Sequence, residues 1–176
     1  MDVAIKSQYL EVLGESLHYL TAGEGKPILF IHGMPMSSHL WRKILPKAAT
    51  QGQVFAVDLI GMGKSSKPDI AYTVTDHLRY VAAFIERLDL KELTLVLHGW
   101  GSVIGFSYAM QHSERIRALA FIEAYLHLPQ DETEVPLPVQ EIAQLAVHPD
   151  DFYRLIVKEN YLVEKILPGI TLKKLG

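Results

Sequence analysis

The chain has 176 residues, of which 49% are hydrophobic and 21% are charged, so it is long enough for one globular domain with a sizeable core and too apolar to be disordered. Its formal net charge of -3 argues against a nucleic-acid partner. The absence of cysteine excludes disulfides, thiolate metal sites and a thiol nucleophile.

The N-terminal segment predicts an antiparallel hairpin and no targeting signal. Residues 9–23, YLEVLGESLHYLTAG, contain two short runs of alternating apolar residues around Gly14, which is the pattern of a β-hairpin. The first ten residues hold no apolar run long enough for a signal peptide, and no run in the chain approaches the length of a bilayer span. A cytoplasmic protein with no membrane partner is therefore expected.

Short apolar runs then predict buried strands that alternate with helices. The runs are PILFIHG (27–33), QVFAVDLIGMG (53–63), LTLVLHG (93–99) and IRALAFIEA (116–124). A helix is predicted before the third run, after Thr73 and Asp76, which are spaced as in a capping box. Another is predicted over residues 101–112, where Gly101 and Gly105 allow close packing on the sheet. This alternation indicates an α/β fold with a mostly parallel sheet.

The composition changes after Ala124. Residues 126–140 are rich in proline and acidic side chains and predict a loop that leaves the sheet. Residues 150–169 predict a helical segment that ends at Pro168. We therefore divide the chain into residues 1–125, the N-terminal part of a core domain, and residues 126–176, the start of a helical cap.

The segment GMGKSS (61–66) partly matches two glycine-rich phosphate-binding motifs but completes neither. A phosphate-binding loop needs glycine where Asp58 stands, and the dinucleotide fingerprint needs a third glycine where Ser66 stands. A tight turn is therefore the favoured interpretation, and nucleotide binding and oxidoreductase chemistry are disfavoured. The eight histidines lack metal-ligand spacing, so we expect no metal and no cofactor.

The segment FIHGMPMSSHLW (30–41) contains a His-Gly pair at the end of a buried strand, which is a common form of oxyanion loop. In that interpretation the backbone N–H of Met34 faces developing negative charge. The alternative is that His32 is a packed residue at a strand end, and the motif alone does not separate the two.

The segment TLVLHGWGSVIGFSYAM (94–110) has the strand–turn–helix pattern of a nucleophile elbow, the strained turn that presents an attacking side chain. Gly99 occupies the apex, and glycine has no side chain with which to attack. Ser102 is excluded by spacing because its neighbours two positions away, Trp100 and Ile104, are bulky. The alternative is a plain turn in which the glycines allow a tight bend.

Glu123 ends the apolar run 116–124, at the carboxyl edge where α/β sheets hold their sites. Its carboxylate could orient a histidine. It could also be solvated at a strand end, and taken alone this second interpretation is favoured.

Five segments taken together resemble the haloalkane dehalogenases, a family with the α/β-hydrolase fold. They are HGMPMSSHLWR, VDLIGMGKSSKPD, HGWGS, FIEAYL and NYLVEKILPG, and they occur in the family's order along nearly the whole chain. The resemblance implies hydrolysis of a carbon–halogen bond in a small apolar substrate. In that family an aspartate attacks the carbon and displaces halide. A histidine near the end of the chain then activates the water that cleaves the alkyl-enzyme ester.

The resemblance also implies roles for four positions. Gly99 stands at the nucleophile position, which is aspartate in the family, and Glu123 stands where one subfamily has the acid that orients the histidine. Trp100 matches the tryptophan that holds the halide, and an indole N–H is a suitable donor to an anion. Met34 stands where many members have an asparagine that also holds the halide, so only its backbone N–H is left for that role.

These departures predict that the chain is inactive or strongly impaired in the family reaction. Gly99 cannot attack, Met34 lacks the amide donor, and the resemblance implies that the chain stops inside the cap, before the last strands and the histidine. Whether it is an enzyme is left open; another hydrolase chemistry would need serine, cysteine or aspartate at position 99. The alternative is a module that binds a small ligand or a protein partner. If the next strand of the fold is missing, the strand at 116–124 is an exposed apolar edge. Such an edge is suited to a complementing C-terminal fragment or to self-association.

Overall fold

The computed structural model describes residues 3–125, 154, 158 and 159. The chain divides into two compact units, residues 1–126 and residues 127–176, and the first is the one described below. The loop and the helix predicted beyond residue 125 lie outside the described residues, apart from Arg154, Lys158 and Glu159. The assignment of residues 126–176 to a helical cap therefore stays a prediction.

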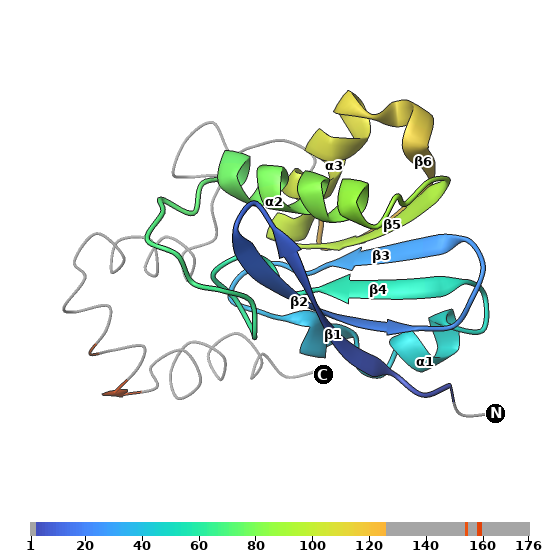
Figure 1. Ribbon diagram of the computed structural model, residues 1–176, viewed down its shortest axis with the longest axis horizontal. Helices are drawn as coiled ribbons and strands as arrows, with labels where there is room; N and C mark the ends of the chain where they lie inside the picture. The colour runs from blue at the N-terminus through green and yellow to red at the C-terminus, as the bar shows by residue number, and fades with distance from the viewer. Residues whose placement is uncertain (1–2, 126–153, 155–157, 160–176) are drawn as a thin grey trace, which may run out of the picture. The chain divides into compact units, whose positions relative to one another are not determined.

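A six-stranded sheet organises the first unit, with the strand order β1-β2-β4-β3-β5-β6 (Figure 1). The strands are β1 Lys6–Val12, β2 Glu15–Ala22, β3 Pro27–Ile31, β4 Gln53–Val57, β5 Leu93–His98 and β6 Ile116–Ile122. The β1–β2 and β2–β4 pairs are antiparallel, whereas β3–β4, β3–β5 and β5–β6 are parallel. The predicted α/β fold, with a mostly parallel sheet behind an antiparallel hairpin, is thereby confirmed.

The N-terminal hairpin closes through a two-residue turn. Val12 pairs with Glu15, and the two residues between them, Leu13 and Gly14, have φ values of 54° and 82°. Positive φ at both central positions gives the turn a twist that matches the twist of paired strands. Glycine adopts such a backbone without steric cost, which explains why the alternating pattern is interrupted at Gly14.

The two helices predicted within residues 3–125 are present close to their expected positions. Helix α2 (Val74–Arg87) begins with the predicted capping box, in which Thr73 Oγ1 accepts from Asp76 N at 3.1 Å and Asp76 Oδ2 accepts from Thr73 N at 2.9 Å. Helix α3 (Trp100–Gln111) lies directly against the sheet. A Cβ atom on Gly101 would overlap backbone carbonyl oxygens at the end of β3, and one on Gly105 would overlap a β5 side chain. The predicted close packing at both glycines is confirmed.

Three shorter helical segments were not predicted from the sequence. They are η1 Ser38–Trp41, α1 Leu45–Ala48 and η2 Ser113–Arg115. Each has only three or four residues, which is too short for a hydrophobic period to be visible. Within the described residues, no helix is both long enough and apolar enough to span a bilayer.

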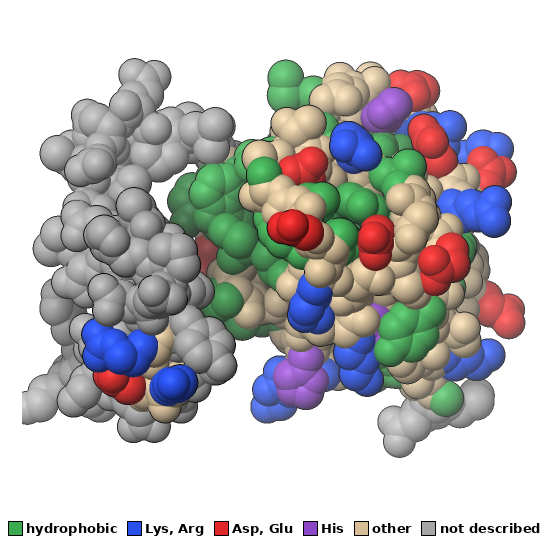
Figure 2. All heavy atoms as spheres, turned by 60° about the vertical axis from the view of Figure 1, so that its left-hand side comes forward, with side chains coloured by type: hydrophobic (Ala, Val, Ile, Leu, Met, Phe, Trp, Pro, Cys, Tyr) green, Lys and Arg blue, Asp and Glu red, His purple; other side chains and the backbone are tan. Residues whose placement is uncertain are grey.

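Two hydrophobic clusters cover the two faces of the sheet, with α2 and α3 on one side and α1 on the other (Figure 1). The larger cluster joins inward-facing strand residues to α2 and α3 and includes Leu29, Leu95 and Phe84, all fully buried. The smaller one is centred on Trp41, which is 1% exposed. On the face shown in Figure 2, side chains of both charges are interspersed and no basic patch is visible.

Strand β6 is the outermost described strand on its side of the sheet, and it is exposed along most of its length. Leu119, Phe121 and Ile122 expose 43%, 50% and 52% of their surface. The predicted exposed apolar edge is therefore present among the described residues. Long apolar edge strands are templates for pairing with another chain.

Candidate functional site

Three segments that are far apart in the sequence meet at the carboxyl edge of the sheet. The parallel register pairs Ile31 with Leu97 and His98 with Ile122, so the residues that follow β3, β5 and β6 end at the same edge. The backbone N–H of Gly99 donates to the carbonyl of Ile122 at 3.3 Å. All four predicted site positions belong to these three chain ends.

The turn after β3 packs tightly on the turn after β5. A Cβ atom placed on Gly33 would lie 3.0 Å from His98 O, 3.0 Å from Trp100 N and 3.3 Å from Gly99 Cα. Only glycine allows this approach without displacement of the backbone. The segment that carries Met34 is therefore held beside the segment that carries Gly99.

Gly99 lies at the turn between β5 and α3. It occupies the N-cap position of α3 with φ 51° and ψ -129°, a strained region that is nearly restricted to glycine. Among the described residues other than its two chain neighbours, a Cβ atom built on Gly99 would contact Gly33 Cα alone, at 3.7 Å.

Ser102 lies one turn into α3 and is not available for chemistry. It is fully buried, and its hydroxyl donates to the carbonyl of Gly99 at 2.6 Å while accepting from the backbone N–H of Tyr125 at 2.9 Å. The structure agrees with the exclusion of Ser102 that spacing alone suggested. Its hydroxyl links the turn at Gly99 to the segment that follows β6.

Trp100 and Met34 differ in their surroundings. Trp100 is half-buried, and its ring lies 5.6 Å from the ring of Tyr125 at an interplanar angle of 32°. Met34 exposes 51% of its surface and precedes Pro35 through a cis peptide bond.

Glu123, at the predicted acid position, contacts the histidine that precedes the apex. Its side chain is 77% exposed, and its Oε2 lies 3.3 Å from Nε2 of His98. The other ring nitrogen of His98, Nδ1, is buried and has no hydrogen-bond partner among the described residues. The sequence predicted an acid role for Glu123 but did not predict its contact with His98.

Residues 26–167 match the family model of the alpha/beta hydrolase fold. The chain belongs to the α/β hydrolase family. Over 176 residues this α/β hydrolase is 39% identical to a haloalkane dehalogenase of Sphingobium indicum, covering 97% of this chain and 59% of that protein. A haloalkane dehalogenase of Mesorhizobium japonicum is 37% identical over 175 residues, covering 98% and 57%.

The same similarity is seen in three dimensions. The crystal structure of the haloalkane dehalogenase DatA from Agrobacterium tumefaciens C58 matches with a TM-score of 0.84 at 37% identity, covering 98% of this chain and 59% of that one. This α/β hydrolase therefore spans about three fifths of the length of the dehalogenases that it matches.

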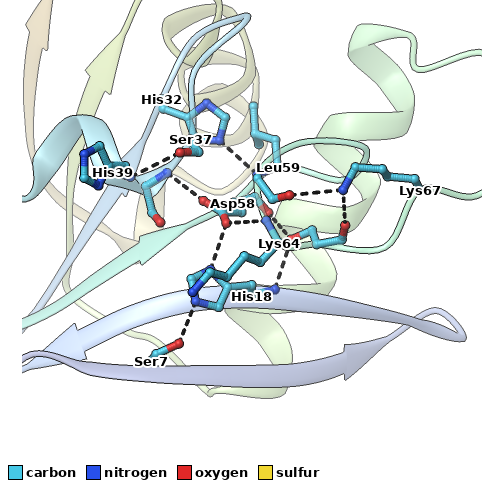
Figure 3. A network of polar contacts seen from close by, with 12 residues as sticks. Ser7, His18, His32, Ser37, His39, Asp58, Leu59, Lys64 and Lys67 are labelled. Atoms are coloured by element: carbon cyan, nitrogen blue, oxygen red, sulfur yellow. Dashed lines mark hydrogen bonds and ion pairs between the residues drawn. The ribbon is translucent and has the colours of Figure 1, made fainter.

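A buried carboxylate, that of Asp58, lies at the centre of the polar network shown in Figure 3. Asp58 follows β4 and is 1% exposed. Its Oδ1 accepts from the backbone N–H of Ser38 at 2.6 Å, and its Oδ2 accepts from Nδ1 of His18 at 2.8 Å and from the backbone N–H of Lys64 at 2.8 Å. One side chain thus joins β2, the start of η1 and the turn at residues 61–66.

The hydrogen bonds to Asp58 keep its carboxyl group ionised. Burial by itself raises the pKa of Asp58, but the N–H groups of Lys64 and Ser38 and the ring of His18 bring the pKa below its ordinary value. Sequence reasoning treated Asp58 only as the residue that breaks a phosphate-binding motif. The GMGKSS segment is confirmed as a turn, with positive φ at Gly61 and Gly63.

His32 is a fully buried, neutral residue that fastens the turn after β3. Its Nε2 accepts from the backbone N–H of Leu59 at 3.1 Å, so the ring proton is on Nδ1, which donates to the carbonyl of Gly33 at 2.8 Å. Burial lowers the pKa of His32, opposed by the hydrogen bond to Gly33 and the charge of Asp58. Among the described residues, no group of three or more potential ligands is arranged to hold a metal ion.

Proposed function

We propose that this α/β hydrolase carries the halide and substrate positions of a haloalkane dehalogenase without the nucleophile, and that it is inactive or strongly impaired in that reaction. The observation that carries the proposal is Gly99, which has the strained apex backbone and no side chain. Removal of a covalent nucleophile typically lowers the rate by several orders of magnitude.

In this proposal the substrate is a small haloalkane. Trp100 donates its indole N–H to the halogen, and the backbone N–H of Met34 faces the same place. Glu123 is the acid of this proposal, and the 3.3 Å contact between its Oε2 and Nε2 of His98 supports that role. The missing step is the displacement of halide by a carboxylate at position 99, which forms the alkyl-enzyme ester.

The test is bromide release from 1-bromobutane by the chain and by its Gly99→Asp variant. Among the described residues, a Cβ atom at position 99 would meet Gly33 Cα alone, at 3.7 Å, which supports the choice of this variant. We expect no bromide above the buffer blank from the original chain. From Gly99→Asp we expect bromide together with a butyl ester at position 99, detected by mass spectrometry.

The matched control is Gly99→Asn, which has nearly the same shape and the same backbone strain but no carboxylate. It should bind bromobutane without releasing bromide. Steady bromide production by the unaltered chain at enzyme-like rates would falsify the proposal, as would a covalent adduct on its turn at Gly99.

A second candidate, a non-catalytic binding module on the same fold, is favoured by the exposed β6 strand. Its apolar residues Leu119, Phe121 and Ile122 are about half exposed, and its outer edge is unpaired among the described strands. In this candidate the edge recruits a complementing C-terminal fragment or a second copy of the chain. Sedimentation of the purified chain, alone and as Leu119→Lys, tests it. A monomer in both cases, with no ligand carried through purification, argues against it.

A further inference from the structure

We propose that Ser7, His18 and Asp58 form a second nucleophilic site, which accepts acyl groups from activated aryl esters. Ser7 Oγ lies 2.8 Å from Nε2 of His18, and Nδ1 of the same ring lies 2.8 Å from Oδ2 of Asp58 (Figure 3). Hydroxyl, imidazole and carboxylate therefore stand in one continuous hydrogen-bonded chain. This is the arrangement that activates a serine by a general base with an orienting acid.

The direction of these hydrogen bonds follows from Asp58. An ionised carboxylate only accepts hydrogen bonds, so Nδ1 of His18 carries the ring proton and donates it to Asp58. In the neutral imidazole, Nε2 then has a lone pair and accepts from the hydroxyl of Ser7. The serine is thus the proton donor at the end of the chain, which is the polarity that nucleophilic attack requires.

The three groups also have the exposure that such a site requires. Ser7 is exposed on β1, whereas His18 and Asp58 are 2% and 1% exposed. Competing water is therefore excluded from the base and the acid while the hydroxyl stays accessible. The backbone N–H of His18 donates to Ser65 Oγ at 3.0 Å, which fixes the strand that carries the imidazole.

An aromatic surface lies next to the hydroxyl. Tyr9 is two residues from Ser7 on the same strand, so both side chains point to the same face of the sheet. The ring of Tyr9 is 57% exposed and lies edge-on to the imidazole of His18, with 5.2 Å between the ring centroids. An aryl leaving group can stack on such a ring, which is why we assign aryl esters as the substrate class.

The proposed step is an acyl transfer. Ser7 Oγ attacks the ester carbonyl carbon as its proton passes to His18 Nε2, and the bond from that carbon to the phenolate oxygen breaks. The proton is then given to the phenolate. In the second half, water attacks the acyl-serine, His18 takes and returns the proton, and the carboxylic acid leaves with the serine restored.

This site is separate from the position of Gly99. Strand β1 is at one end of the strand order, and three strands, β2, β4 and β3, separate it from β5, which leads to Gly99. A halide assay and an ester assay therefore report on different groups. Failure of one proposal leaves the other unaffected.

The experiment is acetylation of the full chain by p-nitrophenyl acetate, followed by peptide mass mapping and by release of p-nitrophenolate. The internal reference is Ser113, an exposed serine with no histidine hydrogen bond among the described residues. We expect Ser7 to be acetylated about 100-fold faster than Ser113, which is the usual contribution of a positioned general base. Ser7→Ala should abolish this fast phase, and the matched control Ser113→Ala should leave it unchanged.

His18→Gln separates activation from simple exposure, because glutamine can hydrogen-bond to Ser7 but is not basic. We expect acetylation of Ser7 to slow by about 100-fold in this variant when circular dichroism shows it to be folded. If the variant does not fold, the comparison of Ser7 with Ser113 in the unaltered chain decides. Equal rates at the two serines, or an unchanged rate in folded His18→Gln, would overturn the proposal.

Discussion

Replacement of Asp58 by asparagine tests whether the buried carboxylate holds together β2, the start of η1 and the turn at residues 61–66. The wild-type side chain accepts three hydrogen bonds, from Ser38 N at 2.6 Å, His18 Nδ1 at 2.8 Å and Lys64 N at 2.8 Å. An asparagine amide has one acceptor oxygen and one NH₂ donor group. With the oxygen toward Ser38, the NH₂ group faces the N–H of Lys64, and that hydrogen bond is lost.

The expected loss of stability follows from these three contacts. A donor left without a hydrogen-bond partner costs about 1–3 kcal/mol. The backbone N–H of Lys64 is near the surface, so its cost is at the low end of this range. The hydrogen bond from Ser38 weakens because the acceptor is no longer charged, and His18 has to change tautomer so that its Nδ1 accepts from the NH₂ group. We therefore expect Asp58→Asn to lower the free energy of unfolding by about 2–4 kcal/mol, a large part of a typical domain's total of about 5–15 kcal/mol.

Urea unfolding monitored by circular dichroism measures this loss. With a slope of about 2 kcal/mol per molar urea, the middle of the typical range of about 1–3, the midpoint should fall by about 1–2 M. Asp69→Asn is the matched control, an exposed acid in the same connection, and its effect should stay within about 0.5 kcal/mol. An effect of Asp58→Asn no larger than that of the control would refute the reasoning.

The pH dependence of the stability difference between the wild type and Asp58→Asn is an independent test. The folded pKa of Asp58 lies below its ordinary value, so its contribution is complete above the unfolded carboxyl pKa, about 4, and is lost as the pH falls through the folded pKa. The stability difference between the wild type and Asp58→Asn should therefore narrow as the pH falls below about 4. A difference that widens on acidification would contradict this assignment.

The two remaining predictions concern a pair of glycines and a buried histidine. Gly99→Ala should cost about 1–3 kcal/mol from backbone strain alone, and Gly101→Ala should cost more, because its Cβ atom would overlap the carbonyl oxygen of Ile31. Urea unfolding of the two variants compares them, and a smaller effect at Gly101 would be inconsistent with the packing. His77 is 4% exposed, neither ring nitrogen has a partner among the described residues, and burial lowers its pKa. Stability should therefore fall as the pH decreases from about 7 to 5, and His77→Leu should reduce that fall in thermal melts, whereas an unchanged pH profile would count against it.

Much of the local structure was predictable because it depends on short stretches of sequence. The hairpin around Gly14 follows from alternating apolar residues and one residue that tolerates positive φ. The start of α2 follows from two side chains three residues apart, Thr73 and Asp76. The position of Gly99 in the turn between β5 and α3 was likewise predictable, because the flanking strand and helix patterns locate that turn.

The partners of the polar side chains were decided only by the tertiary structure. Asp58 and His18 are 40 residues apart, and their contact exists because β2 lies beside β4 in the sheet. The contact of His98 with Glu123 exists because β5 and β6 run parallel and pair His98 with Ile122, the residue before Glu123. A hydrophobic period indicates which face of a strand is buried but carries no information about which strand lies next to it. Sequence alone therefore determined the six strands, the two longer helices and the glycine in the turn after β5, and the pairing of strands determined which polar groups meet.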